Sequence, residues 1–114
     1  MENSLEEEIL KLYREPGIGA SYQNTYGEMN ISNLVGKYRQ LCSEEMQQMR
    51  DLVTLYSTSY DLMSSFVSVG VLHALGMNDE VEEAYRWAGT QEDAEKIISH
   101  FDIGKSLAEH FASG

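Results

Sequence analysis

The most apolar stretch of the chain reads Phe66-Val67-Ser68-Val69-Gly70-Val71-Leu72-His73-Ala74-Leu75. A helix formed here would be apolar on most sides, and such a helix belongs at the centre of a bundle or at an oligomer interface. The alternating, β-branched first half also permits a short strand. No other segment offers a partner strand, so we predict a buried helix. The stretch is much shorter than the ~20 residues that cross a membrane as a helix, and we expect no membrane span.

Apolar residues recur at spacings of three and four on both sides of this stretch, which predicts an all-α fold. Gly76 should end the central helix, in the C′ role that glycine fills at helix ends. Before the stretch, Ser57-Thr58-Ser59 can break and recap the helix, with Thr58 or Ser59 as the cap. Residues 43–75 therefore form either one long central helix or two helices divided near 57–59. The small residues within 64–74 would let another helix approach closely.

The N-terminal third predicts two helices joined by an irregular loop. Ser4 and Glu7 form a capping box that opens the first helix. Residues 16–30 hold glycines and small polar residues and are expected to form the loop. Asn30 or Ser32 is expected to cap the second helix.

The C-terminal third predicts three short amphipathic helices, over residues 78–89, 90–101 and 102–112. The expected caps of these helices are Asn78, Thr90 and Asp102. Residues 112–114 are expected to fray. Residues 1–114 are therefore predicted to form a single-domain bundle of five to six helices.

Charge narrows the classes of partner. The 114 residues include 19 Asp and Glu against 8 Lys and Arg, for a formal net charge of −11. The basic residues are scattered, whereas nucleic-acid affinity depends on clustered Lys and Arg that displace counterions. We therefore expect no direct nucleic-acid binding and no binding to anionic membranes. A basic protein partner is favoured instead.

Cysteine usage and the first residues predict a cytoplasmic protein. Cys42 is the only cysteine, so no internal disulfide is possible. It follows Tyr38 and Leu41 on an apolar helical stripe, which predicts a buried, reduced thiol. Residues 43–45, Ser-Glu-Glu, place negative charge beside it, opposite to what a nucleophilic cysteine needs. The N-terminal residues carry no basic and apolar leader of the secretory type.

The strongest functional signal is an acidic segment at residues 79–95. Its seven acids against one base, Arg86, leave a charge of −6. Carboxylates on rigid helices can imitate a phosphate backbone or cover a basic active site. We predict a non-enzymatic protein-binding module of the inhibitor, immunity or adaptor type that docks this face on a basic protein. Trp87 is either the apolar anchor of that interface or a core residue. The predicted contact residues are Asp79, Glu80, Glu82, Glu83, Trp87, Glu92, Asp93 and Glu95.

A homo-oligomeric structural or assembly protein is the first alternative. The 60–75 segment is more apolar than a small monomer needs, so it can form a homodimer interface while the acids serve solubility. The expected interface residues are Tyr60, Met63, Phe66, Val67 and Val71.

A Mg²⁺-dependent hydrolase is the second alternative. Glu82-Glu83-x-x-Arg86 partly resembles the Glu-Glu-x-x-Glu element of the small helical nucleotide pyrophosphatases, which hold metal between paired helices. That resemblance would imply a nucleotide substrate and Mg²⁺, but Arg86 stands where an acid belongs and the following Glu-x-x-Asp element is missing. His73, His100 and His110 show no metal-ligand spacing. We therefore expect no catalytic residue, no metal and no cofactor.

Overall fold

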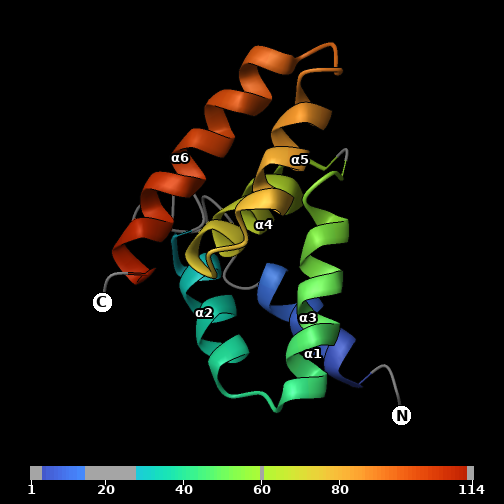
Figure 1. Cartoon of the computed structure of the whole chain (residues 1–114), viewed down its shortest axis with the longest axis vertical. Coiled ribbons are helices and arrows are strands. Elements are labelled where there is room, and N and C mark those ends of the chain that lie inside the picture. The colour runs from blue at the N-terminus through green and yellow to red at the C-terminus, as the bar shows by residue number, and fades with distance from the viewer. Residues whose placement is uncertain (1–3, 15–27, 60, 113–114) are drawn as a thin grey trace.

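Six helices and no strand form in the part of the chain that the computed structural model describes, residues 4–14, 28–59 and 61–112. The all-α prediction is therefore confirmed. The helices are α1 (Ser4–Arg14), α2 (Glu28–Arg39), α3 (Ser43–Tyr56), α4 (Leu62–Ala74), α5 (Asn78–Ala88) and α6 (Ala94–Ala112). Figure 1 shows α6 along one side of the molecule with α5 beside it, while α1, α2 and α3 group at the other end.

Helix α4 is the centre of the bundle. It packs against α2, α3, α5 and α6. Every residue from Ser65 to Leu72 is buried, so all sides of these two turns are covered. The predicted buried helix is confirmed, and the alternative strand is not formed. No helix in the described ranges is both long and apolar enough to cross a membrane.

The segment 43–75 forms two helices and not one long central helix. Helix α3 ends at Tyr56, and α4 begins after Asp61, whose carboxylate accepts a hydrogen bond from the Ser64 backbone N–H at 3.1 Å. The predicted break is therefore correct, but the predicted cap is wrong. The Thr58 hydroxyl donates back to the Leu55 carbonyl instead, and Ser59 Oγ accepts from the Asp61 N–H.

Helix α4 ends in a Schellman motif, which confirms the predicted role of Gly76. Gly76 has a φ of 76°, a left-handed conformation that favours glycine. Its N–H donates to the His73 carbonyl, and the Met77 N–H donates to the Leu72 carbonyl at 2.9 Å. Met77 then serves directly as the N-cap of α5, so Asn78 is already inside the helix. The predicted Asn78 cap is wrong because only Leu75, Gly76 and Met77 separate the two helices, and Met77 already takes the N-cap position.

A single 19-residue helix, α6, replaces two of the three short helices predicted for the C-terminal third. The Thr90 hydroxyl donates to the Trp87 carbonyl at 2.6 Å, so it closes α5 and does not cap α6. Asp102 lies inside α6, where its carboxylate accepts a hydrogen bond from the Tyr85 hydroxyl at 2.6 Å. Both predicted caps are wrong because each side chain has a partner on α5.

Helices α4 and α6 cross at two glycines. A Cβ atom added to Gly104 would lie 2.8 Å from the Phe66 carbonyl oxygen, and one added to Gly70 would lie 3.1 Å from the Gly104 carbonyl oxygen. The backbones are therefore too close for any side chain at Gly104. The close helix approach expected from the small residues of 64–74 is confirmed at Gly70.

Two buried polar residues fasten α1 to the bundle. Asn30 is fully buried within α2, and its Nδ2 donates to the carbonyls of Leu12 (2.9 Å) and Tyr13 (3.2 Å). These carbonyls belong to the last turn of α1, which lacks intrahelical donors. The Tyr13 hydroxyl in turn lies 2.5 Å from Ser68 Oγ of α4. Asn30 therefore completes the end of α1 and does not cap α2, contrary to the prediction.

Several predictions near the chain ends fall outside the described residues. The Ser4 side chain, most of the 16–30 loop and residues 113–114 are among them. Residues 28–30 belong to α2 and not to the predicted loop. Ala112 belongs to α6 and not to the predicted frayed end.

Cys42 is exposed, so the predicted buried thiol is wrong. Helix α2 ends at Arg39, and Cys42 occupies the N-cap of α3 in an extended conformation. Its backbone N–H donates to the Glu45 carboxylate at 3.4 Å. The apolar stripe of α2 therefore stops before Cys42, and Ser43 begins a new helix.

The glycine crossing predicts opposite effects for the same substitution at two sites. Gly104→Ala should lower the free energy of unfolding by about 1–3 kcal/mol, because its methyl group meets the Phe66 carbonyl and overpacks the crossing. Gly36→Ala is the matched control, since a Cβ there meets nothing within 4 Å, and it should stabilise α2 by about 0.4–1 kcal/mol. Urea unfolding followed by circular dichroism measures both. A Gly104→Ala protein as stable as the wild type would contradict the crossing.

The role of Asn30 predicts a second stability difference. Asn30→Ala should destabilise the protein by about 1–3 kcal/mol, because it leaves one buried and one partly buried α1 carbonyl without their donor. Asn33→Ala, at an exposed position of the same helix, should change stability by less than about 0.5 kcal/mol. The same urea unfolding measurement compares them, and equal effects would refute the role given to Asn30.

Candidate binding site

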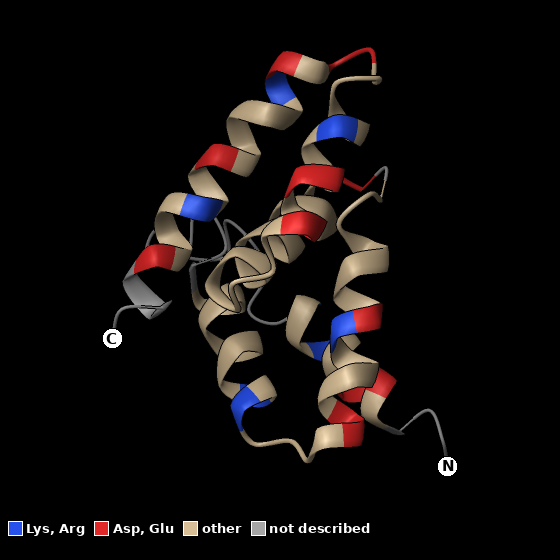
Figure 2. Ribbon diagram, in the orientation of Figure 1, with Lys and Arg blue, Asp and Glu red and all other residues tan. Residues whose placement is uncertain are grey.

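The seven acids of the predicted contact face lie in two groups at opposite ends of α5. The α5 group, defined as Asp79, Glu80, Glu82 and Glu83, occupies the first half of that helix. The turn group, defined as Glu92, Asp93 and Glu95, follows the last turn of α5 and opens α6. An 11-residue helix is about 16 Å long, so the two groups do not share one compact face. Arg86 lies between them on α5. Figure 2 shows basic positions interleaved with acidic ones along α6.

Basic side chains offset part of the α5 group. Arg86 Nη2 lies 3.4 Å from the Glu83 carboxylate, in an exposed pair one helical turn apart. Glu82 lines a groove between α5 and α6 together with Arg86 and Lys105. The Lys105 ammonium lies 5.1 Å from the centre of the Tyr85 ring. This half of the acidic segment is therefore a mixed surface of both charges.

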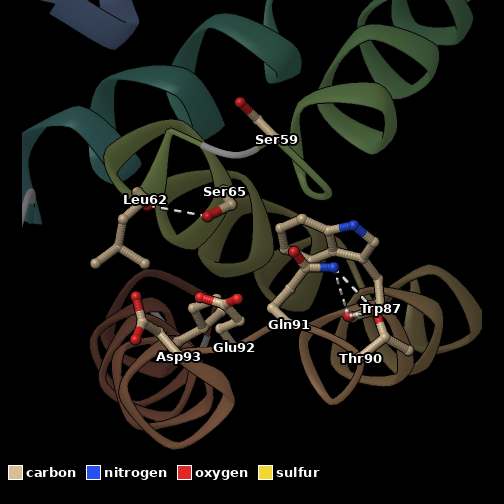
Figure 3. Close-up of a pocket in the computed structure, with 9 residues that line it drawn as sticks. Ser59, Leu62, Ser65, Trp87, Thr90, Gln91, Glu92 and Asp93 are labelled. Atoms are coloured by element: carbon tan, nitrogen blue, oxygen red, sulfur yellow. Dashed lines mark hydrogen bonds between the residues drawn. The ribbon is translucent and has the colours of Figure 1, made fainter.

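Two members of the turn group, Glu92 and Asp93, border a hollow with a volume of about 420 Å³. The hollow lies where the end of the α3–α4 connection, the start of α4, the end of α5 and the start of α6 meet. Figure 3 shows the Glu92 and Asp93 carboxylates on one side of it and the Trp87 indole on the other. Its lining residues are Ser59, Leu62, Ser65, Trp87, Thr90, Gln91, Glu92, Asp93 and Ile97.

Hydrogen bonds hold the turn that carries these acids. The Thr90 hydroxyl and the Gln91 amide both donate to the Trp87 carbonyl, at 2.6 and 3.5 Å. The Gln91 amide also donates to Thr90 Oγ at 2.9 Å. On the opposite wall, the Ser65 hydroxyl donates to the Leu62 carbonyl at 3.0 Å. Ser65, Thr90 and Gln91, three of the lining side chains, are therefore held by hydrogen bonds to nearby backbone carbonyls.

The hollow is negatively charged and apolar at the same time. The Glu92 and Asp93 side chains are exposed, and neither carboxylate has a hydrogen-bond or ion-pair partner among the described residues. None of the lining residues is a Lys, Arg or His. Trp87, Leu62 and Ile97 supply apolar surface, and all three are half-buried. Such a site favours a cation that also carries apolar surface.

Trp87 is neither fully in the core nor fully exposed. It packs against the core cluster, as one of the two sequence interpretations expected, and it also lines the hollow. Its role as an interface anchor stays a prediction. Ser59, Leu62 and Ser65 were missed by sequence reasoning because they are far from the acids along the chain. Thr90 and Gln91 lie within the acidic segment. Two polar side chains directly after Gly89 could have predicted a hydrogen-bonded turn there.

The residues expected at an oligomer interface are mostly inside the monomer. Phe66, Val67 and Val71 are at most 4 % exposed, because α2, α5 and α6 surround α4. Met63 is half-buried, and Tyr60 lies outside the described residues. The monomer core therefore accounts for the apolar character of the 60–75 segment.

The carboxylates show no metal-binding arrangement in the described ranges, where no three His, Cys, Asp or Glu side chains converge to hold an ion. Glu82 and Glu83 lie at the other end of α5 from Glu92 and Asp93. The His73 Nε2 lies 3.3 Å from the Glu109 carboxylate, and the His100 Nδ1–H donates to the Lys96 carbonyl. Both histidines have partners in the packing of α4 and α6.

No family model matches this sequence, and neither the curated proteins nor the solved structures contain a match to it.

The hydrogen bond between Tyr85 and Asp102 predicts a pH dependence of stability. Burial, the hydrogen bond to Asp102 and its negative charge raise the pKa of Tyr85 above its ordinary value of 10. The folded state thus favours the protonated phenol, so this contribution is complete below pH 10 and is lost as the pH rises above it. Tyr85→Phe should lower the free energy of unfolding by about 1 kcal/mol at pH 7.

Tyr85→Phe should also reduce the loss of stability above pH 10. Some loss will persist, because burial raises the pKa of Tyr13 as well. Urea unfolding at pH 7 and pH 11 measures the difference. An identical loss in the variant and the wild type would show that the α5–α6 hydrogen bond does not contribute.

Proposed function

We propose that the protein is a small acidic, non-enzymatic binding module that docks on a basic protein, as an inhibitor, an immunity protein or an adaptor does. The observation that supports this function best is the turn group at the hollow. Glu92 and Asp93 present two carboxylates without described partners beside the half-buried indole of Trp87. Interfaces use such aromatic anchors at their centres, with charged groups around them.

The two acidic groups have different roles in this proposal. Glu92 and Asp93 of the turn group make the contact, because their carboxylates have no counter-charge in the hollow. The α5 group adds to the net charge of −11 and steers a basic partner during the encounter, while Arg86 and Lys105 reduce its local effect. The surface around α5 therefore influences the association rate more than the lifetime of the complex.

The proposed site of action is the cytoplasm. A single cysteine that is exposed at a helix N-cap is compatible with a reducing compartment, where thiols stay free. The described structure gives no support to a homo-oligomer built on 60–75, since Phe66, Val67 and Val71 are already buried within the chain.

The division of roles predicts different effects of two charge reversals. Glu92→Lys/Asp93→Lys should weaken the complex by roughly tenfold or more, because it places like charges against a basic partner. Glu82→Lys/Glu83→Lys changes the net charge equally and should act mainly on the association rate. A pull-down from host lysate at low and high salt isolates the partner, and surface plasmon resonance then measures both rates for each variant.

Two results would refute the proposed function. One is a partner retained equally at low and high salt, which would exclude charge as the main attraction. The other is an unchanged dissociation rate after reversal of Glu92 and Asp93, which would place the contact elsewhere.

A further inference from the structure

The chemistry of the hollow excludes most classes of occupant. An anionic group would meet the Glu92 and Asp93 carboxylates with no cation in the lining. A wholly apolar group would remove those carboxylates from water without a partner, which is unfavourable. A bare metal ion would find no third ligand among the described His, Cys, Asp and Glu side chains. A cation with an apolar stem satisfies both parts of the lining.

The space and the walls suit a side chain from a partner. The volume of about 420 Å³ falls within the range of about 300–1,000 Å³ that is usual for ligand sites. Leu62 and Ile97 can pack against an aliphatic stem. The Glu92 and Asp93 carboxylates lie together on one side of the hollow (Figure 3). Lysine and arginine both have such stems and carry their charge at the tip.

The lining distinguishes the two basic side chains. Two adjacent carboxylates present several acceptor oxygens in a small region, and the planar guanidinium offers five N–H donors that match such an arrangement. The Trp87 indole opposite them supplies an aromatic surface, on which a guanidinium stacks and gains cation–π attraction. The lysine ammonium is a compact, strongly hydrated charge, so it pairs less well with two carboxylates and stacks less well on an indole than a guanidinium does.

We propose that this hollow is the binding site for an arginine side chain of the partner protein. The guanidinium lies between the Trp87 indole and the carboxylates of Glu92 and Asp93, and its stem lies against Leu62 and Ile97. This inference rests on the proposed function and names the chemistry of its contact. In this proposal one arginine of the partner is the anchor of the interface, and the surrounding charges act mainly on the association rate.

Short peptides test the site without the partner in hand. The probe is a glycine-serine peptide with one central arginine, and its controls carry citrulline or lysine at the same position. Citrulline has the shape of arginine without the charge. The readout is the indole N–H signal of Trp87 in a ¹H–¹⁵N NMR titration of the full chain, since this is the only Trp. We expect a saturable shift with the arginine peptide, a weaker one with lysine and none with citrulline.

Matched variants locate the binding. Glu92→Gln/Asp93→Asn should weaken the arginine peptide roughly tenfold, as expected when hydrogen bonds to charged groups are lost. Glu7→Gln/Glu44→Gln removes the same two charges at exposed positions of α1 and α3, and should change the affinity less than about twofold. All four positions are exposed, so the variants should fold, and circular dichroism checks that they do.

Each other result would overturn the arginine site. These results are the absence of a saturable shift, equal binding of the citrulline or lysine peptide, and equal weakening by the two double variants. Shifts confined to the amides of Asp79, Glu82 and Glu83 would also overturn it, while leaving the proposed acidic docking intact. Conversely, arginine binding in the hollow together with a partner that is insensitive to salt would preserve this site and refute the proposed function.

Discussion

Helices α4 and α6 cross closely at Gly70 and Gly104, and this crossing determines where the other helices pack. The backbones approach so closely that a methyl group at Gly104 would meet the Phe66 carbonyl oxygen at 2.8 Å. This proximity lets α4 bury every residue from Ser65 to Leu72. With α6 fixed against α4, helix α5 packs beside both. The Schellman turn at Gly76 joins it to α4, and the hydrogen bond from Tyr85 to Asp102 joins it to α6.

The position of the candidate site follows from that arrangement. The α5–α6 turn comes to lie over the start of α4, so that Glu92 and Asp93 face Leu62 and Ser65 across a hollow. Trp87 packs against the core cluster and also lines the hollow, so the proposed binding surface is in contact with the packed interior. A rigid wall of this kind reduces the ordering that association would otherwise require. The two carboxylates meanwhile stay exposed and available to a basic group.

Local patterns predicted the helices well but not their ends. The apolar spacing gave the all-α fold, the buried helix at 66–75 and the Gly76 terminus, because each depends on short-range periodicity or on one special backbone conformation. The predictions that Asn30, Thr90 and Asp102 cap helices were wrong, because each side chain is hydrogen-bonded to a group outside the helix start that it was expected to cap. The predicted burial of Cys42 was wrong for a similar reason, because its exposure depended on exactly where α2 ends. The acids of the site were visible in the sequence, whereas Leu62 and Ser65 join them only through tertiary packing.

Native-state hydrogen exchange measures the opening free energy of each helix separately, so it can show whether the α4–α6 crossing stabilises the whole bundle. If the α4–α6 crossing supports the bundle, the amides of Ser65–Leu72 and those around Gly104 will exchange only through global unfolding, with a common free energy. The amides of the α5–α6 turn and of α1 will then exchange through smaller openings. Exchange of the α4 amides at a lower free energy than those of α1 would contradict the account.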